Sequence, residues 1–252
     1  MRSAWIVDHF PNLVAVRLEG MRLENADELT SLSALTDLVI NTPKETRRSL
    51  GFIPRLRDVK RLELTVVFEE DTVALDGCSA LNRCILRQWP FGDFKRIPNL
   101  CVQDLVVVGG SIANPLGLCC NRLASITFAN CRKLANLEGL SVSELEIGSC
   151  KGVDLHGLHA VNGLKNLSLI DHAHLHSFDF VLNCRQLEEL TISATKVFAK
   201  DIGPLIESTS LLKLTIYNVP DKVITAVGLA NTSLSVPNEN VRVRKGQIEK
   251  VG

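Results

Sequence analysis

Histidine and cysteine are the side chains of this 252-residue sequence that could do chemistry. Imidazole is a common zinc ligand, and most of the histidines cluster at His156, His159, His172, His174 and His176. Cys131, Cys150 and His172 also share one position of a repeated pattern, so they would stack in a row about 4.8 Å apart. Three ligands in a line suit tetrahedral zinc poorly, and no fourth is evident. The alternative is that each side chain hydrogen-bonds turn backbone, so we expect no metal site and no cofactor.

Nucleophilic catalysis is the second chemistry to consider. Cys150 and His156 are close enough in sequence to form a Cys–His pair, but such a pair needs a third group to hold the histidine and a pocket for substrate. The sequence has no Gly-x-x-x-x-Gly-Lys, Cys-x-x-Cys or Gly-x-Ser-x-Gly motif. We therefore expect no catalytic residues and no enzyme activity.

The eight cysteines have an even count that would allow disulfides. Disulfide frameworks belong to short secreted chains that cannot build a core, whereas this chain is long enough to build one. The vicinal pair Cys119 and Cys120 would also form a strained bridge. We interpret the cysteines as reduced, buried thiols, which favours an intracellular, reducing compartment: cytoplasm or nucleus, with an organelle matrix left open.

A repeat of about 22 residues must position all of these side chains. The pattern Leu-x-x-Leu-x-Leu, with any aliphatic residue or cysteine allowed, recurs at intervals of 19 to 24 residues along the chain. Its copies begin at Leu13, Leu35, Val59, Leu81, Val102, Leu123, Val142, Leu164, Leu187, Leu211 and, in a degraded last copy with Leu234 and Val236, Asn231. So regular a spacing predicts a stack of similar units.

Each copy of the pattern predicts one short strand. Its last two aliphatic residues are two apart, so both point to one face of a strand and the residue between them points to the other face. One copy cannot bury its aliphatic face alone, so successive strands must stack in parallel. The return segments contain Pro43, Pro54, Pro90, Pro98 and Pro115, which disfavour long helices. The later return 200–207 has room for a short helix.

This arrangement resembles the leucine-rich-repeat superfamily over roughly residues 10–240. The middle copies, Cys131-x-x-Leu134, Cys150-x-x-Val153 and His172-x-x-Leu175, look like the irregular, cysteine-bearing repeats of intracellular members. The subfamily is not assigned. The resemblance implies an α/β solenoid, a horseshoe with a parallel sheet on its concave face and short irregular or helical segments on its convex face. It also implies a scaffold for protein–protein interaction.

The organisation that we expect is a single domain over 1–252, with about eleven repeats in 12–240. Residues 1–11 would cap the first repeat. Residues 241–252 would cap the last one, with 241–244 as a charged edge strand. Lys plus Arg and Asp plus Glu number 28 each, so no net charge attracts nucleic acid or membrane. We also expect neither a membrane span nor a signal peptide.

The outward-facing row of the sheet is the predicted binding site. Val39, Ile85 and Val106 place aliphatic side chains where solvent is expected, and Arg87 flanks them. An apolar centre with a charged rim is typical of a protein interface. The alternative is that neighbouring returns cover this patch. The residues predicted to bind a protein partner are Arg17, Val39, Glu63, Ile85, Arg87, Val106, Val108, Thr127, Glu146 and Tyr217.

A basic return segment supports the alternative function. Its cations could contact phosphate, as in an RNA-associated subunit of a ribonucleoprotein, although few aromatic residues lie near it for base stacking. These possible anion contacts are Lys44, Arg47, Arg48, Arg55, Arg57, Lys60 and Arg61.

Overall fold

The computed structural model of the chain describes residues 7–20, 26–42, 50–65, 69–76, 78, 81–118, 122–171, 175–193, 203–217, 241–244 and 247–250. Several predictions fall outside these residues: those on Lys44, Arg47, Arg48, Cys119, Cys120, His172 and His174, the last repeat copy at 231–236, and the cap residues 1–6. The chain divides into two compact units, Met1–Ile126 and Thr127–Gly252, and each is described by itself.

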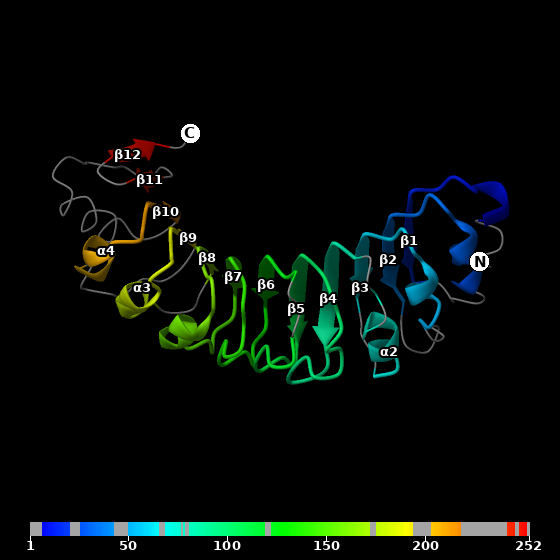
Figure 1. Ribbon diagram of the computed structural model, residues 1–252, viewed down its shortest axis with the longest axis horizontal. Coiled ribbons are helices and arrows are strands. Elements are labelled where there is room, and N and C mark those ends of the chain that lie inside the picture. The colour runs from blue at the N-terminus through cyan, green and yellow to red at the C-terminus, as the bar shows by residue number, and fades with distance from the viewer. Residues whose placement is uncertain are drawn as a thin grey trace. The chain divides into compact units, whose positions relative to one another are not determined.

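The first unit is a ladder of parallel strands, one from each repeat (Figure 1). Each strand pairs in parallel with the next one along the chain, from β1 to β5. The strands are β1 (Ala15–Glu19), β2 (Asp37–Asn41), β3 (Arg61–Leu64), β4 (Arg83–Trp89) and β5 (Asp104–Gly110). Each contains the last two aliphatic positions of its repeat, so the predicted strands and their order are confirmed.

The inward faces of these strands form the core of the first unit. Leu38, Leu62, Cys84 and Leu105 occupy one register position in successive strands and are each 0% exposed. Burying one such aliphatic side chain stabilises the fold by about 1.5–3 kcal/mol. These side chains pack between neighbouring strands, so a single repeat could not exclude water from its own apolar side chains.

The returns of the first unit are short, as the prolines predict. They hold the 3₁₀ helices η1 (Ala26–Ser31) and η3 (Ile53–Arg55) and the α-helix α2 (Asp71–Asp76). Pro54 lies in the first turn of η3, where its missing N–H costs nothing. These helices contribute Leu29, Ile53 and Leu75 to the core.

The second unit continues the same pattern with more regular returns. Strands β7 (Glu144–Gly148), β8 (Asn166–Ile170), β9 (Glu189–Ser193) and β10 (Lys213–Tyr217) pair in parallel in chain order. Between them lie η4 (Leu155–Ala160), α3 (Asp179–Asn183) and α4 (Gly203–Glu207), so the short helix expected in 200–207 is present. Strand β6 (Ser125–Ala129) contains the boundary between the two units.

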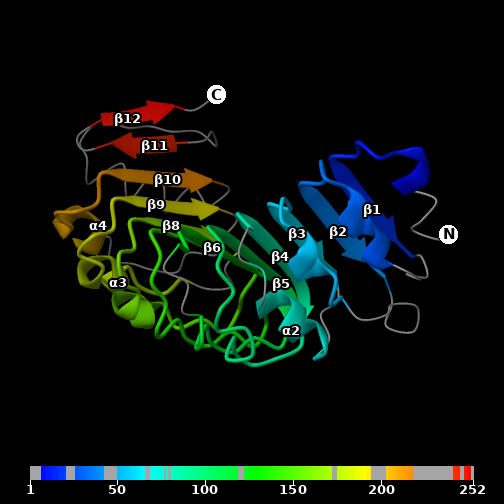
Figure 2. The same ribbon diagram turned by 45° about the vertical axis from the view of Figure 1, so that its right-hand side comes forward.

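Two antiparallel strands follow β10, as Figure 2 shows. They are β11 (Val241–Arg244), which pairs with β10, and β12 (Gln247–Lys250), which pairs with β11. The expectation that 241–244 is an edge strand is therefore wrong. The alternation of Val and Arg predicts the strand itself, but alternation alone does not tell whether a further strand follows.

The strands of the second unit end in tight left-handed turns. Asn130, Ser149 and Asp171 follow β6, β7 and β8 with φ of 55°, 52° and 47°. Each donates its backbone N–H over 2.8 Å to a carbonyl of the next repeat, on Gly148, Ile170 and Ser193 respectively. The turn of one repeat is thus held by the strand of the next.

None of the helices among the described residues has the length and apolar character that crossing a membrane requires.

Gly110 provides a test of this close inter-strand packing. Its φ is +91°, and a Cβ added there would lie 2.1 Å from the carbonyl oxygen of Trp89 on β4. We expect Gly110→Ala to lower the free energy of unfolding by roughly 2 kcal/mol or more, because backbone must move. Gly92→Ala is the control, since a Cβ there meets no atom within 4 Å, and we expect a change within about 0.5 kcal/mol. Urea unfolding measures both, and equal losses would contradict the model of backbone contact at Gly110.

Candidate partner-binding face

The predicted central row lies on the face of the sheet opposite the core, which we call the open face. Arg17 pairs in register with Val39, Val39 with Glu63, Glu63 with Ile85, and Ile85 with Val106. Arg87 pairs with Val108 in the same way, beside this row. The register that the repeat predicted is therefore confirmed in the first unit, and five of the predicted binding residues lie on β3, β4 and β5: Glu63, Ile85, Arg87, Val106 and Val108.

The aliphatic residues of this row are less open to solvent than predicted. Val39 is 7% and Ile85 6% exposed, so the expectation of open aliphatic side chains is wrong for these two, whereas Val106 and Val108 are half-buried. The physical reason is the strand spacing of about 4.8 Å, which places the long side chain of Glu63 directly beside both Val39 and Ile85. The stems of charged side chains can then cover apolar surface.

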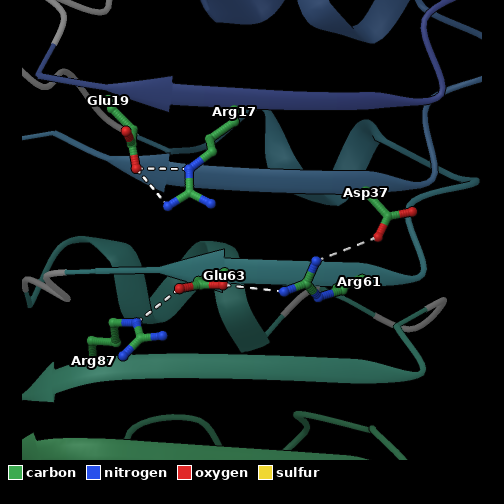
Figure 3. A network of polar contacts seen from close by, with 6 residues as sticks. All are labelled: Arg17, Glu19, Asp37, Arg61, Glu63 and Arg87. Atoms are coloured by element: carbon green, nitrogen blue, oxygen red, sulfur yellow. Dashed lines mark hydrogen bonds and ion pairs between the residues drawn. The ribbon is translucent and has the colours of Figure 1, made fainter.

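A charge network built around Glu63 occupies the same face (Figure 3). Oε1 of Glu63 accepts a hydrogen bond from Nε of Arg87 at 2.8 Å, and Oε2 lies 3.3 Å from Nη2 of Arg61. Arg61 also reaches Asp37 at 3.8 Å. The Glu63 side chain is 10% exposed, against 42% for Arg61 and 41% for Arg87. The buried carboxylate therefore fixes two arginines whose outer parts remain open to solvent.

The sequence contains a signal for this network that the prediction of a basic return segment misses. That prediction includes Arg61, yet Arg61 is the first residue of β3 and faces outward with Glu63. Aligning the repeats by register would have placed Arg61, Glu63 and Arg87 on one face. By contrast, the pair of Arg17 and Glu19, 2.6 Å apart and largely exposed, is of the kind that contributes little to stability.

The rest of the basic segment does not gather into one described cluster. Lys44, Arg47 and Arg48 lie outside the described residues. Arg55 pairs with Asp27 at 2.8 Å. Arg57 and Lys60 are exposed. Among the residues that the structure describes, the segment thus contributes one paired cation, two exposed ones, and Arg61 on the open face.

The outward row of the second unit is polar. Glu146, Ser168, Thr191 and Thr215 occupy one register position from β7 to β10, and Lys213 forms an ion pair with Glu189 beside them. Thr127 lies on β6 and is half-buried, like Glu146. For Tyr217 the backbone is described as the last residue of β10, and the side chain lies outside the described part.

Cys131 and Cys150, which share one position of the repeat, form hydrogen bonds with backbone at the turns between strands. The Cys131 N–H donates to the Cys150 sulfur at 3.3 Å, and the Cys150 thiol lies 3.3 Å from the Gly148 carbonyl and 3.4 Å from that of Phe128. Hydrogen bonds from the Cys131 thiol and then from its backbone hold the pKa of Cys150 below its ordinary value, against the effect of burial. The interpretation that these side chains satisfy turn backbone is confirmed for Cys131 and Cys150.

The histidines stand apart from this row. His156 is exposed, whereas Cys150 is 0% exposed and its thiol bonds the backbone of Cys131, Gly148 and Phe128. His159 hydrogen-bonds the His156 carbonyl through Nδ1 at 2.6 Å. Across the described part of the chain, no three His, Cys, Asp or Glu side chains come together in a way that could hold a metal ion.

Of the other described cysteines, Cys78, Cys84 and Cys184 are buried and Cys101 is half-buried. None of the six cysteines within the described residues forms a disulfide. Burial raises the pKa of Cys78 to about 12 and that of Cys184 to about 11. Such thiols remain protonated at neutral pH and act as small apolar groups.

Comparison with known proteins identifies the fold. An internalin (inlF) from Listeria monocytogenes matches with a TM-score of 0.50 and 15% identity over 84% of this chain. The chain has the leucine-rich-repeat fold. The α/β solenoid predicted from the repeat is thus confirmed, and the subfamily is not assigned. This leucine-rich-repeat chain spans 62% of the internalin's length, and at such identity the likeness concerns the fold alone.

Two further solved structures are similar at lower scores. They are an internalin C2 from Listeria monocytogenes (17% identity, 83% of this chain and 74% of that chain, TM-score 0.32) and a leucine-rich-repeat protein from Leptospira interrogans (14%, 86% and 76%, TM-score 0.33). No family model and no curated protein matches the sequence.

Replacing Glu63 tests the charge network. Glu63→Ala leaves Arg61 and Arg87 facing each other without their carboxylate, and because both arginines are partly exposed we expect a loss of about 1–2 kcal/mol in the free energy of unfolding. The control is Glu19→Ala, which removes an exposed pair and should cost within about 0.5 kcal/mol. Urea denaturation gives both values. Similar losses in the two variants would mean that Glu63 is no more than a surface ion pair.

Replacing Cys150 tests the turn hydrogen bonds. Cys150→Val keeps an apolar side chain but leaves the buried Cys131 N–H without its acceptor, which costs about 1–3 kcal/mol. Cys150→Ser keeps a donor and an acceptor at this position, so we expect the smaller loss there. The comparison uses urea denaturation in the presence of a reductant. A valine variant as stable as the serine variant would show that the thiol contributes packing alone.

Proposed function

We propose that this protein is a non-catalytic interaction scaffold that binds a protein partner on the open face of its leucine-rich-repeat sheet, the face expected to be concave. The observation that carries the proposal is the patch on β4 and β5, where half-buried Val106 and Val108 lie in register with Ile85 and Arg87. An apolar centre beside a partly exposed arginine is the composition that concentrates binding energy at protein interfaces.

The charge network supports the same proposal. The Glu63 carboxylate holds Arg87 through Nε, while 41% of the arginine side chain stays exposed. An arginine that is already ordered loses less conformational entropy when it meets a partner's carboxylate. The preferred partner surface would therefore carry an aliphatic or aromatic anchor next to an acidic residue.

We propose that the remaining predicted residues contact the same partner on either side of the patch. Arg17 and Val39 would lie on the N-terminal side of the patch, and Thr127, Glu146 and Tyr217 would form a more polar contact on the second unit. We also propose that 1–252 form one domain, since the repeat pattern continues through β6. No observation within the described residues favours the RNA-associated alternative.

A matched pair of substitutions tests the open face. Val106→Glu places a charge in the patch at a half-buried position, so we expect the partner to be lost while the melting temperature changes by only a few degrees. Thr191→Glu is the control, because it makes a comparable change on the open face at β9. Partners are captured from native lysate by tagged wild-type protein, identified by mass spectrometry, and then compared across the variants.

Two results would contradict this proposal. If Val106→Glu remains folded and retains every partner that the wild type captures, the site is elsewhere. If Thr191→Glu loses the same partner to the same extent, the patch has no special part in binding. Repeating the capture from low to moderate salt concentration separates the two functions. A mainly apolar interface should retain its partner as salt rises, whereas binding to phosphate weakens steeply with salt.

A further inference from the structure

A groove in the second unit lies between two successive returns, away from the open face. Its volume is about 430 Å³, and it is lined by the end of η4 with the following loop and by the end of α3 with its loop. Both loops lead directly into strands, β8 and β9 respectively. The groove is thus placed by the same stacking that places the sheet.

The shapes of the two returns explain why space is left between them. Residues 155–160 form a 3₁₀ helix, whereas 179–183 form a short α-helix. A 3₁₀ helix is narrower and rises more per residue than an α-helix, so the two cannot stack along their whole length as identical returns would. Asp154 fixes the first of them by accepting a hydrogen bond from the His156 N–H at 2.9 Å.

The groove has an apolar floor and an open rim. Leu158, Val161, Leu164 and Cys184 are between 1% and 6% exposed and form the floor. Leu182 on α3 lies at the rim and is 41% exposed. The remaining rim consists of exposed polar side chains, on His159, Asn162, Asn183, Arg185 and Gln186.

The charge of the groove has one sign. Arg185 and His159 line it, and none of the described residues that line it is acidic. Within the described part of the chain, no carboxylate pairs with Arg185, whereas nearby Lys165 is neutralised by Glu188 at 3.0 Å. His159 uses Nδ1 for the His156 carbonyl, which leaves Nε2 available. The complementary ligand is therefore an anion with an apolar part.

We propose that this groove is a second binding site, which takes a short acidic peptide segment of a protein partner. An aliphatic side chain of the peptide would cover Leu182 and the floor, and a neighbouring carboxylate would pair with the guanidinium of Arg185. The rim amides of Asn162, Asn183 and Gln186 would bind peptide backbone, which has a donor and an acceptor at each residue. A rim this open fits an extended chain better than an enclosed small molecule. The site is independent of the function proposed above.

The probe is a fluorescein-labelled, amide-capped hexapeptide of alternating glutamate and leucine, titrated against the full chain by fluorescence anisotropy. We expect saturable binding, and we expect Arg185→Gln to weaken it at least about tenfold, as the loss of a charge-assisted bond does. Leu182→Ser should weaken it severalfold. Arg132→Gln is the matched control, since Arg132 is an exposed arginine in another turn of the same unit, and its affinity should be that of the wild type.

The other outcomes each overturn the proposal. They are no binding by the wild type, equal weakening by Arg185→Gln and Arg132→Gln, or equal binding of a peptide with lysine in place of glutamate. Displacement by free glutamate at the same concentration as unlabelled peptide would make the occupant a small carboxylate instead.

Amide chemical shifts locate the bound peptide. We expect them to change at residues 158–164 and 182–186, which line the groove. Arg185 and Arg132 are both exposed, so we expect neither substitution to change the melting temperature much. Measuring the melting temperature of each variant checks that it is folded.

Discussion

The parallel register between neighbouring strands is the constraint on which the rest of this structure depends. A single repeat contributes one short strand and a few aliphatic side chains, too little to exclude water, so each repeat is stable only against the next. Leu38, Leu62, Cys84 and Leu105 meet at one register position and are fully buried. A slip of one residue would turn each of them to solvent. The register is therefore fixed strongly, and every outward residue is fixed with it.

The same constraint decides what the open face can hold. Glu63 sits between Val39 and Ile85 because the register puts it there, and burial of its carboxylate is tolerated since Arg61 and Arg87 supply opposite charges. A buried carboxylate without such partners would be costly. The Ser and Thr side chains in the outward row of the second unit are uncharged. They need only a hydrogen bond and no partner of opposite charge. The two units thus share a backbone pattern but differ in the chemistry of their outward faces.

The repeat period made the fold predictable, whereas side-chain cover and return packing were not. Two aliphatic positions in each copy were enough to place strands β1 to β10 and to align Arg17, Val39, Glu63, Ile85 and Val106. The burial of Val39 and Ile85 depends on neighbours some 22 residues away in sequence, so a period cannot reveal it. The groove beside Leu182 depends on one return being a 3₁₀ helix and the next an α-helix. No repeated residue marks that difference.

Strands and returns therefore offer two different supports for binding. A side chain on the open face is held by strands that also carry the core, so it is precisely placed, and the enclosed ones are packed between neighbours on both sides. Val39 and Ile85, enclosed at 7% and 6% exposure, have little freedom to vary. A side chain on a return, such as Arg185 or Leu182, touches fewer neighbours and can change at small cost to stability. A protein built from such repeats can thus keep a fixed interface on its strands while its returns diversify, because the register does not depend on them.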